Sequence, residues 1–298
     1  MTLPPRRIGI VGNREKKGAR VLLPALVRWL KDRDLSVMLE KSIASAVRGL
    51  GTGLPLRSLV ARSDAVLVLG GDGTFLAAAR EAARADVPIL GVNLGGLGFL
   101  TETAESDLYT ALEQLVAGDV EIEPRMMVEA KVTSRAGKGA WTEVGLNDVV
   151  IHQSDESRMV QLELRIGRTP IGTLAADGLI VATPTGSTAY SLSAGGPIVR
   201  PTIEALLATP ICPHSLAFRP LLVGAGEKLR VRVGASVNKA RLTIDGQISR
   251  LLGAGDDVEI RRARTRVSLL SLRRESFYEV LREKLAWAGP QTRTKVHE

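Results

Sequence analysis

One ten-residue stretch, residues 67–76, constrains the fold of this chain more than any other. An apolar run over residues 65–69 stops at Gly70-Gly71-Asp72-Gly73, and an alanine-rich helical pattern follows over residues 75–85. This order predicts a buried strand that ends in a tight turn and opens a helix. Such a turn presents backbone N–H groups at the positive end of the helix, which favours phosphate binding there.

Asp72 is the residue of this turn that is hardest to explain by packing. A carboxylate is repelled by phosphate unless a cation lies between them or the carboxylate acts as a base. We therefore expect Asp72 to take part in chemistry, and the alternative is that it only caps the helix. The chain has no Gly-x-x-x-x-Gly-Lys-Ser/Thr loop, so a P-loop kinase is excluded. A phosphate site would then have to come from this turn, that is, from Gly70, Gly71, Gly73 and Thr74.

The first part of the chain, up to about residue 122, alternates between strand and helix patterns. Strands are expected over residues 7–11, 36–39, 65–69 and 89–92, and helices over residues 19–32, 75–85 and 106–117. This alternation predicts an α/β domain with a Rossmann-like parallel sheet, whose ligands bind at the carboxyl ends of the strands. The Asp72 turn falls at such an end.

From about residue 123 the pattern becomes mostly strand. Strands are expected over residues 128–133, 144–151, 160–166, 173–182, 229–233, 241–244 and 258–262. Within this part only residues 202–208 and the region after Ser187 favour helix, and helical spacing returns over residues 277–287. The pattern predicts a mostly β, β-sandwich-like second domain and a two-domain α+β chain overall.

Composition excludes several classes of function. The chain of 298 residues carries a formal net charge of +8, but aromatic residues make up only 3%, so a stacking surface for nucleic acid is not expected. No apolar stretch has the length of a membrane span, and the N-terminus lacks a signal-peptide core. The single cysteine, Cys212, excludes an intrachain disulfide, and the histidines lack zinc-site spacing. A cytoplasmic protein that binds neither nucleic acid nor membrane is expected.

Further polar segments follow the Asp72 turn, and packing does not explain them: Asn147-Asp148, Asp177-Gly178 and residues 183–191 (Thr-Pro-Thr-Gly-Ser-Thr-Ala-Tyr-Ser). These segments and the Asp72 turn together resemble the bacterial branch of the NAD kinase family, the enzymes that phosphorylate NAD to NADP. The resemblance extends in order to Asn93-Leu94-Gly95, residues 97–100, Pro213-His214, residues 219–221, Asp245-Gly246-Gln247 and residues 277–281. It therefore covers nearly the whole chain.

The resemblance implies a reaction and an organisation. Asp72 would accept the proton of the 2′-hydroxyl of the adenosine ribose, with Gly73 against the same substrate, and ATP would donate the phosphoryl group. A divalent cation, expected to be Mg²⁺, would arrive with ATP rather than in a protein metal site. The α/β domain would comprise residues 1–122 with residues 268–298 packing back on it, and residues 123–267 would bind NAD. Relatives form homodimers or homotetramers, so an oligomer is implied.

The resemblance also implies a set of residues that bind NAD. Asn147 and Asp148 would bind ribose hydroxyls, and Asp177 would contact the nicotinamide end; an Asx-turn and a β-turn acid are their respective alternatives. In the hydroxyl-rich loop, Tyr190 would stack on a base, with Thr188, Ala189 and Ser191 lining the adenine pocket. Leu192 and Ser193 would also belong to the residues that bind NAD.

Three further positions are less specific. Gln247 matches a position near the substrate, although Asp245-Gly246 is also an ordinary hairpin turn. Arg158 matches a position that reaches the nucleotide in some members. Ala175 stands where many relatives carry a polar or charged residue associated with the choice between NAD and NADH, so the use of NADH stays open. Two alternatives to NAD kinase remain: a lipid kinase of the diacylglycerol or sphingosine type, which shares the glycine-rich turn, and a non-catalytic NAD(P) sensor.

Overall fold

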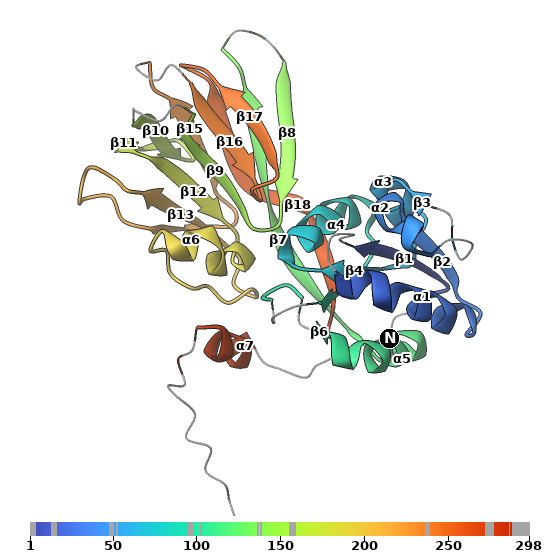
Figure 1. The fold of residues 1–298 in the computed structure, drawn as a ribbon. Helices are drawn as coiled ribbons and strands as arrows, with labels where there is room; N and C mark the ends of the chain where they lie inside the picture. Colours follow the sequence, from blue (N-terminus) through green and yellow to red (C-terminus); the bar gives the residue numbers. More distant parts are fainter. Residues whose placement is uncertain are drawn as a thin grey trace, which may run out of the picture.

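The chain forms two domains that lie side by side in a computed structural model (Figure 1). The structure describes residues 4–12, 17–47, 51, 53–94, 98–101, 103–135, 137, 139–154, 159–235, 239–271, 277–285 and 287. The helices are α1 (Lys17–Lys31), α2 (Lys41–Ala44), α3 (Leu56–Val60), α4 (Asp72–Ala85), α5 (Leu108–Ala117), α6 (Tyr190–Ser193) and α7 (Phe277–Lys284). Short 3₁₀ turns lie at Ser45–Val47, Glu105–Asp107 and Thr185–Thr188. None of the described helices is long and apolar enough to cross a membrane.

The first domain is a parallel sheet with helices on both faces, as predicted. Its strands lie in the order β5 (Ile89–Asn93), β4 (Ala65–Gly70), β1 (Arg7–Gly12), β2 (Ser36–Glu40), β3 (Gly53–Leu54), with the two-residue β6 (Thr103–Ala104) beside β5. Helices α1 and α5 pack on one face, and α3 and α4 pack on the other. Because both faces are covered, the strands are apolar runs rather than alternating ones, and their sequences predict them well.

The second domain contains two packed layers of antiparallel strands, which confirms the β-sandwich-like prediction. One layer has the order β14 (Leu221–Gly224), β13 (Ala205–Ile211), β12 (Gly178–Ala182), β9 (Asp148–Gln153), β16 (Ala240–Ile244), β17 (Ile248–Leu252). The other has the order β11 (Thr169–Ala176), β10 (Val160–Ile166), β15 (Lys228–Val233), β18 (Asp257–Ser271), β7 (Glu121–Thr133), β8 (Ala140–Gly145). Their inner faces share one apolar core, in which Leu162 and Val231 of one layer belong with Ile151 and Leu242 of the other.

Strands β7 and β18 connect the domains, because β18 continues into the first sheet and pairs there with β5 at Leu269 and Ile89. The predicted domain boundaries at residues 122/123 and 267/268 fall inside these two strands. Helix α7 follows β18 in sequence and lies below the second domain in Figure 1, at about the height of α5. The ring of its Tyr278 lies 5.9 Å from the guanidinium carbon of Arg200 in the second domain.

Three predictions of secondary structure are wrong. Residues 202–208 were expected to favour helix, but most of them lie in β13, where pairing with β12 and β14 overrides local preference. Residues 144–151 form two strands, because the amides of residues 146–148 turn away from the strand ladder toward the side chain of Asp245. Residues 173–182 also form two strands, since the chain crosses from one layer to the other at Asp177.

Candidate active site

Asp72 is the first residue of α4, directly after the strand and turn that the sequence predicts. Gly71 caps the helix with extended backbone, and its carbonyl accepts hydrogen bonds from the amides of Thr74 (3.0 Å) and Phe75 (3.2 Å). Thr74 packs back over Gly70, where an added Cβ would lie 3.0 Å from the threonine hydroxyl. The positive end of the α4 dipole therefore lies at the glycine-rich turn, as an anion site requires.

The carboxyl group of Asp72 is enclosed by the segment 98–101. A Cβ on Gly98 would lie 2.5 Å from both Oδ1 of Asp72 and Oγ1 of Thr101, so only glycine fits between them. Both of these oxygens are buried, and neither makes a hydrogen bond of ordinary geometry within the described part of the chain. Burial raises the pKa of Asp72, while the positive charge of Lys284 in α7 and the nearby amides of Leu100 and Phe99 act in the opposite direction. The half-buried carboxyl group of Asp72 thus lies beside a helix N-terminus, with its Oδ1 toward segment 98–101.

A cavity of about 530 Å³ opens on the outer face of the six-stranded layer. Strand β9 contributes Asp148, Val150 and His152 from alternate positions, because side chains two residues apart share a face of a strand. The remaining lining residues are Asn147, Gln153, Asp177, Ala189, Tyr190, Ile211, Thr243, Asp245 and Gly246. Polar atoms therefore converge on one wall of a cavity of the size that small ligands occupy.

Several of these polar groups are buried without a hydrogen-bond partner or beside a like charge, which costs free energy unless a ligand binds them. Burial raises the pKa of Asp148 to about 7, and the neighbouring charge of Asp245 adds to the effect. Oδ1 of Asn147 and Oε1 of Gln153 are buried without a hydrogen-bond partner among the described residues. Perturbed carboxylates and unpaired polar atoms are features of functional sites.

The hydroxyl-rich loop is held together largely by its own side chains. Thr183 donates to the carbonyl of Leu146 (2.6 Å), Ser187 to that of Pro184 (2.6 Å), and Thr188 to that of Thr185 (3.1 Å). The loop also packs tightly against the backbone of Asn147, since a Cβ on Gly186 would lie 2.1 Å from the carbonyl oxygen of that residue. These hydroxyls therefore position the loop, and Ala189 and Tyr190 are the loop residues that reach the cavity.

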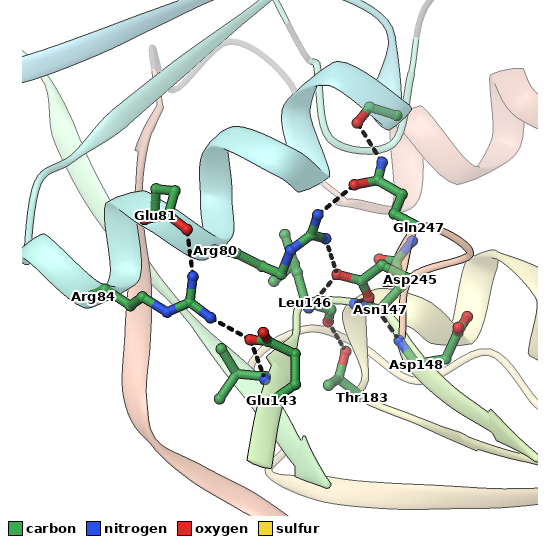
Figure 2. A network of polar contacts seen from close by, with 12 residues as sticks. Arg80, Glu81, Arg84, Glu143, Leu146, Asn147, Asp148, Thr183, Asp245 and Gln247 are labelled. Atoms are coloured by element: carbon green, nitrogen blue, oxygen red, sulfur yellow. Dashed lines mark hydrogen bonds and ion pairs between the residues drawn. The ribbon is translucent and has the colours of Figure 1, made fainter. Parts of the chain in front are cut away.

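A network of polar contacts joins α4 to this cavity (Figure 2), and we call it the Arg80 network. Arg80 of α4 forms an ion pair with Asp245 (3.1 Å) and donates to Oε1 of Gln247. Asp245 also accepts hydrogen bonds from the amides of residues 146–148 at 2.8–3.1 Å. Gln247 in turn donates to the carbonyl of Gly73 (2.6 Å). The Asp72 turn and the Asn147-Asp148 pair are thereby connected through one set of contacts.

The predicted site residues fall into two groups. The structure brings Asn147, Asp148, Asp177, Ala189 and Tyr190 together around the cavity, and Gln247 connects them to the turn of Gly70, Gly71, Asp72, Gly73 and Thr74. The structure does not place Thr188, Ser191, Leu192 or Ser193 among the lining residues, and the Ser191 hydroxyl bonds to that of Thr209 (2.9 Å). Arg158 lies outside the described residues.

Ala175 also lies away from the cavity lining. The strand expected over residues 173–182 contains both Ala175 and Asp177, but Ala175 is in β11 and the chain changes layers at Asp177. Ala175 pairs with Gln161 of β10, while its neighbours Leu174 and Ala176 enter the core. The side chain of Ala175 therefore points away from the core.

Sequence reasoning missed several residues near this site, and Arg80 is the most informative. It lies in an otherwise apolar, alanine-rich helix face, and it is buried. A charged residue in such a position needs a partner, which is a signal available from the sequence. Nothing in the sequence identifies that partner, because Asp245 is 165 residues further along the chain.

The comparisons with known proteins agree with this geometry. The family models for the ATP-NAD kinase N-terminal and C-terminal domains match residues 55–120 and 146–272. The NAD kinase of Syntrophotalea carbinolica is 44% identical over 282 residues, covering 95% of this chain and 99% of that protein. The NAD kinase of Desulforamulus reducens is 44% identical over 278 residues, covering 93% of this chain and 96% of that protein.

Solved structures show the same architecture. The Archaeoglobus fulgidus NAD kinase in complex with ATP matches with a TM-score of 0.73 and 25% identity, covering 94% of this chain and 98% of that one. The yeast NADH kinase complexed with NADH has the same fold, with a TM-score of 0.88 at 24% identity, over 98% of this chain and 90% of that one. The family models, the identity to curated relatives and the shared fold lead to one conclusion: this chain belongs to the NAD kinase family.

Proposed function

We propose that this NAD kinase transfers the terminal phosphoryl group of ATP to the 2′-hydroxyl of the adenosine ribose of NAD, giving NADP and ADP. The observation that carries the proposal is the connection of two different sites by the Arg80 network. Asp72 lies at the N-terminus of α4, and Gly73 beside it is hydrogen-bonded through Gln247 to the rim of the 530 Å³ cavity. Phosphoryl transfer needs such a shared frame, because its catalysis depends mainly on positioning and charge stabilisation.

In this proposal Asp72 is the base that accepts the proton of the ribose hydroxyl. Asp72 is only half-buried, and its elevated pKa favours taking up a proton more than an exposed aspartate does. Asn147 and Asp148 bind ribose hydroxyls, and Asp177 contacts the nicotinamide end of NAD. Tyr190 stacks on a base, with Ala189 beside it.

ATP binds at the positive end of α4, against Gly70, Gly71, Gly73 and Thr74. A divalent cation bound to the triphosphate, expected to be Mg²⁺, fits beside Asp72, because a hard cation takes oxygen ligands and the carboxyl group of this half-buried residue lies at the turn. When bound, the cation neutralises phosphate charge and removes the repulsion between phosphate and Asp72. A cytoplasmic location and assembly into homodimers or homotetramers remain predictions from the family resemblance.

The two alternatives have less support. A lipid kinase would need a large apolar pocket, whereas the wall of this cavity carries three carboxylates, two amide side chains and a histidine beside its apolar residues. A sensor without turnover would need no base. Asp72 is nevertheless present, and Gly98 leaves the space that its carboxyl group occupies.

The test is to measure ADP release with ATP and Mg²⁺, with and without NAD, and to measure NADP as the product. We expect ADP and NADP to form in equal amounts and ADP release to cease without NAD. The same assay with NADH and with inorganic polyphosphate defines the acceptor and donor range. ADP release that is independent of NAD, or the absence of NADP, would overturn the proposal.

A further inference from the structure

Arg80 occupies an unusual position between the two domains. It lies eight residues after Asp72 on α4, about two helical turns along the same helix. Its side chain is 8% exposed and that of its partner Asp245 is fully buried. A buried ion pair is a weak source of stability, but leaving one of its members unpaired is costly. The pair therefore fixes the relative position of the elements that carry it.

The carboxylate of Asp245 holds the backbone of residues 146–148, next to the cavity of the second domain. Its Oδ1 accepts from the amides of Asn147 (2.8 Å) and Asp148 (3.1 Å), and its Oδ2 accepts from that of Leu146 (3.0 Å). These contacts are charge-assisted, and they occur where the chain leaves β8 and begins β9. The direction in which Asn147 and Asp148 face is thus set by a side chain that Arg80 holds.

Gln247 provides a second route between the same two elements. Its Oε1 accepts from the guanidinium of Arg80, and its Nε2 donates to the carbonyl of Gly73. Arg80 therefore holds both the hairpin between β16 and β17 and, through Gln247, the first turn of α4. Figure 2 shows how the guanidinium directs one nitrogen to each of the two partners.

We propose that Arg80 is a positioning residue for phosphoryl transfer, which fixes the Asp72 end of α4 relative to Asn147 and Asp148. The inference rests on the proposed function, since it gives the two ends of the network their roles. The base and the ribose-binding residues come from different domains, so their geometry depends on the contact between the domains. A guanidinium is required because a lysine ammonium is a single point charge that lacks the planar fork serving both Asp245 and Gln247.

The network also has an electrostatic consequence at Asp148. The charge of Asp245 contributes to the elevated pKa of Asp148, and Arg80 lies on the opposite side of Asp245. Loss of the Arg80 charge would leave Asp245 uncompensated, and we expect this to raise the pKa of Asp148 further. Such a variant leaves unsubstituted the other titratable residues that line the cavity, which are His152, Asp177 and Tyr190.

The experiment compares Arg80→Lys and Arg80→Met with the matched control Arg84→Met in the full-length chain. Arg84 lies one turn further along α4 and also joins it to the second domain, through an ion pair with Glu143 of β8. It is 40% exposed and contacts neither Asp245 nor Gln247. Thermal unfolding establishes that each variant folds. The steady-state constants for NAD and ATP are then measured, together with the NAD dissociation constant as a function of pH.

We expect Arg80→Met to lower kcat/KM for NAD by on the order of 10²-fold, the effect of a misplacement of about 1 Å. Arg80→Lys should lower it less and leave the pH midpoint of NAD affinity in place, because it keeps the charge. Arg80→Met should move that midpoint to higher pH. Arg84→Met should retain the kinetic constants of the wild type.

The outcomes separate this inference from the proposed function. A wild-type chain that forms no NADP contradicts the proposed function whatever the variants do. An active wild type with both Arg80 variants indistinguishable from Arg84→Met would overturn the inference, as would a folded Arg80→Met with reduced activity and an unchanged pH midpoint. If Arg80→Met does not fold, Arg80→Lys decides: a kcat/KM for NAD equal to that of the wild type refutes the role of the guanidinium.

Discussion

Asp148→Asn is expected to stabilise the free protein at neutral pH while weakening its affinity for NAD. Asp148 is buried at the cavity wall, and burial together with the charge of Asp245 raises its pKa to about 7. An ionised carboxylate in this position therefore costs folding free energy. Asparagine has nearly the same shape and no charge, so it removes this cost, but it also removes the charged acceptor that we assign to the ribose hydroxyls.

The magnitude follows from the difference between the two pKa values. The folded state keeps a proton that the unfolded state, with the ordinary value of 3.8, releases. The free energy of unfolding of the wild type therefore falls as the pH rises from about 4 to about 7, and this contribution is constant above that range. At about 1.36 kcal/mol per pH unit, the full loss is about 4 kcal/mol. The asparagine variant avoids it.

The assay is urea unfolding of variant and wild type between about pH 5 and pH 8, with NAD titrations in parallel. The stability gained by Asp148→Asn should grow by about 2 kcal/mol between pH 5 and pH 7 and then level off. NAD binding should weaken by about 1.5–3 kcal/mol at pH 8. Val150→Ala, which alters the same cavity wall without a titrating group, should show the same difference from wild type at every pH. A gain from Asp148→Asn that does not depend on pH would refute the reasoning.

Three further predictions concern the same site. Asp72→Asn should keep the melting temperature and lose about 10²–10⁴-fold in kcat, because the amide cannot accept the ribose proton; a near wild-type kcat contradicts the assignment. Gly98→Ala places a methyl group 2.5 Å from Oδ1 of Asp72 and should lower kcat by on the order of 10²-fold, whereas Gly226→Ala, whose methyl meets no described atom within 4 Å, should not. Asp177→Ala should weaken NAD binding by about 1.5–3 kcal/mol in calorimetric titration and leave ATP binding in place; unchanged NAD affinity contradicts its role.

The sequence predicts the Asp72 turn well because the information is local. An apolar strand, two glycines and an alanine-rich helix follow one another directly in the sequence. Strand β4 covers residues 65–70 where 65–69 were predicted, and α4 covers residues 72–85 where 75–85 were predicted. The parallel sheet of the first domain follows from the same kind of local pattern. In the second domain, period-2 patterns predict most strands, but not where a strand ends, because tertiary contacts decide that.

The break at Leu146 shows why such endings are not predictable. Residues 144–151 are extended and apolar enough to be one strand, yet the amides of residues 146–148 bond to Asp245 instead of a neighbouring strand. Asp245 itself has the sequence signature of a hairpin turn, with a positive φ of 49° before Gly246. Its role as a buried acceptor depends on Arg80, which is distant in sequence. Local propensity contains no information about that pairing.

Three of the aspartates of the site differ in what their oxygens contact, and this difference supports the separate roles that we propose for them. Asp245 accepts three backbone amides and faces a guanidinium, so its carboxylate is committed to the protein. Asp148 is held through its backbone and presents its side chain to the cavity, where the committed charge of Asp245 raises its pKa. Asp72 lies half-buried at a helix N-terminus, where burial raises its pKa. Paired carboxyl groups in unlike environments are how one fold assigns different tasks to the same residue type. Here the Arg80–Asp245 pair supplies that difference, because it compensates one carboxylate and leaves the other two for the roles that we propose for them, ligand binding and proton acceptance.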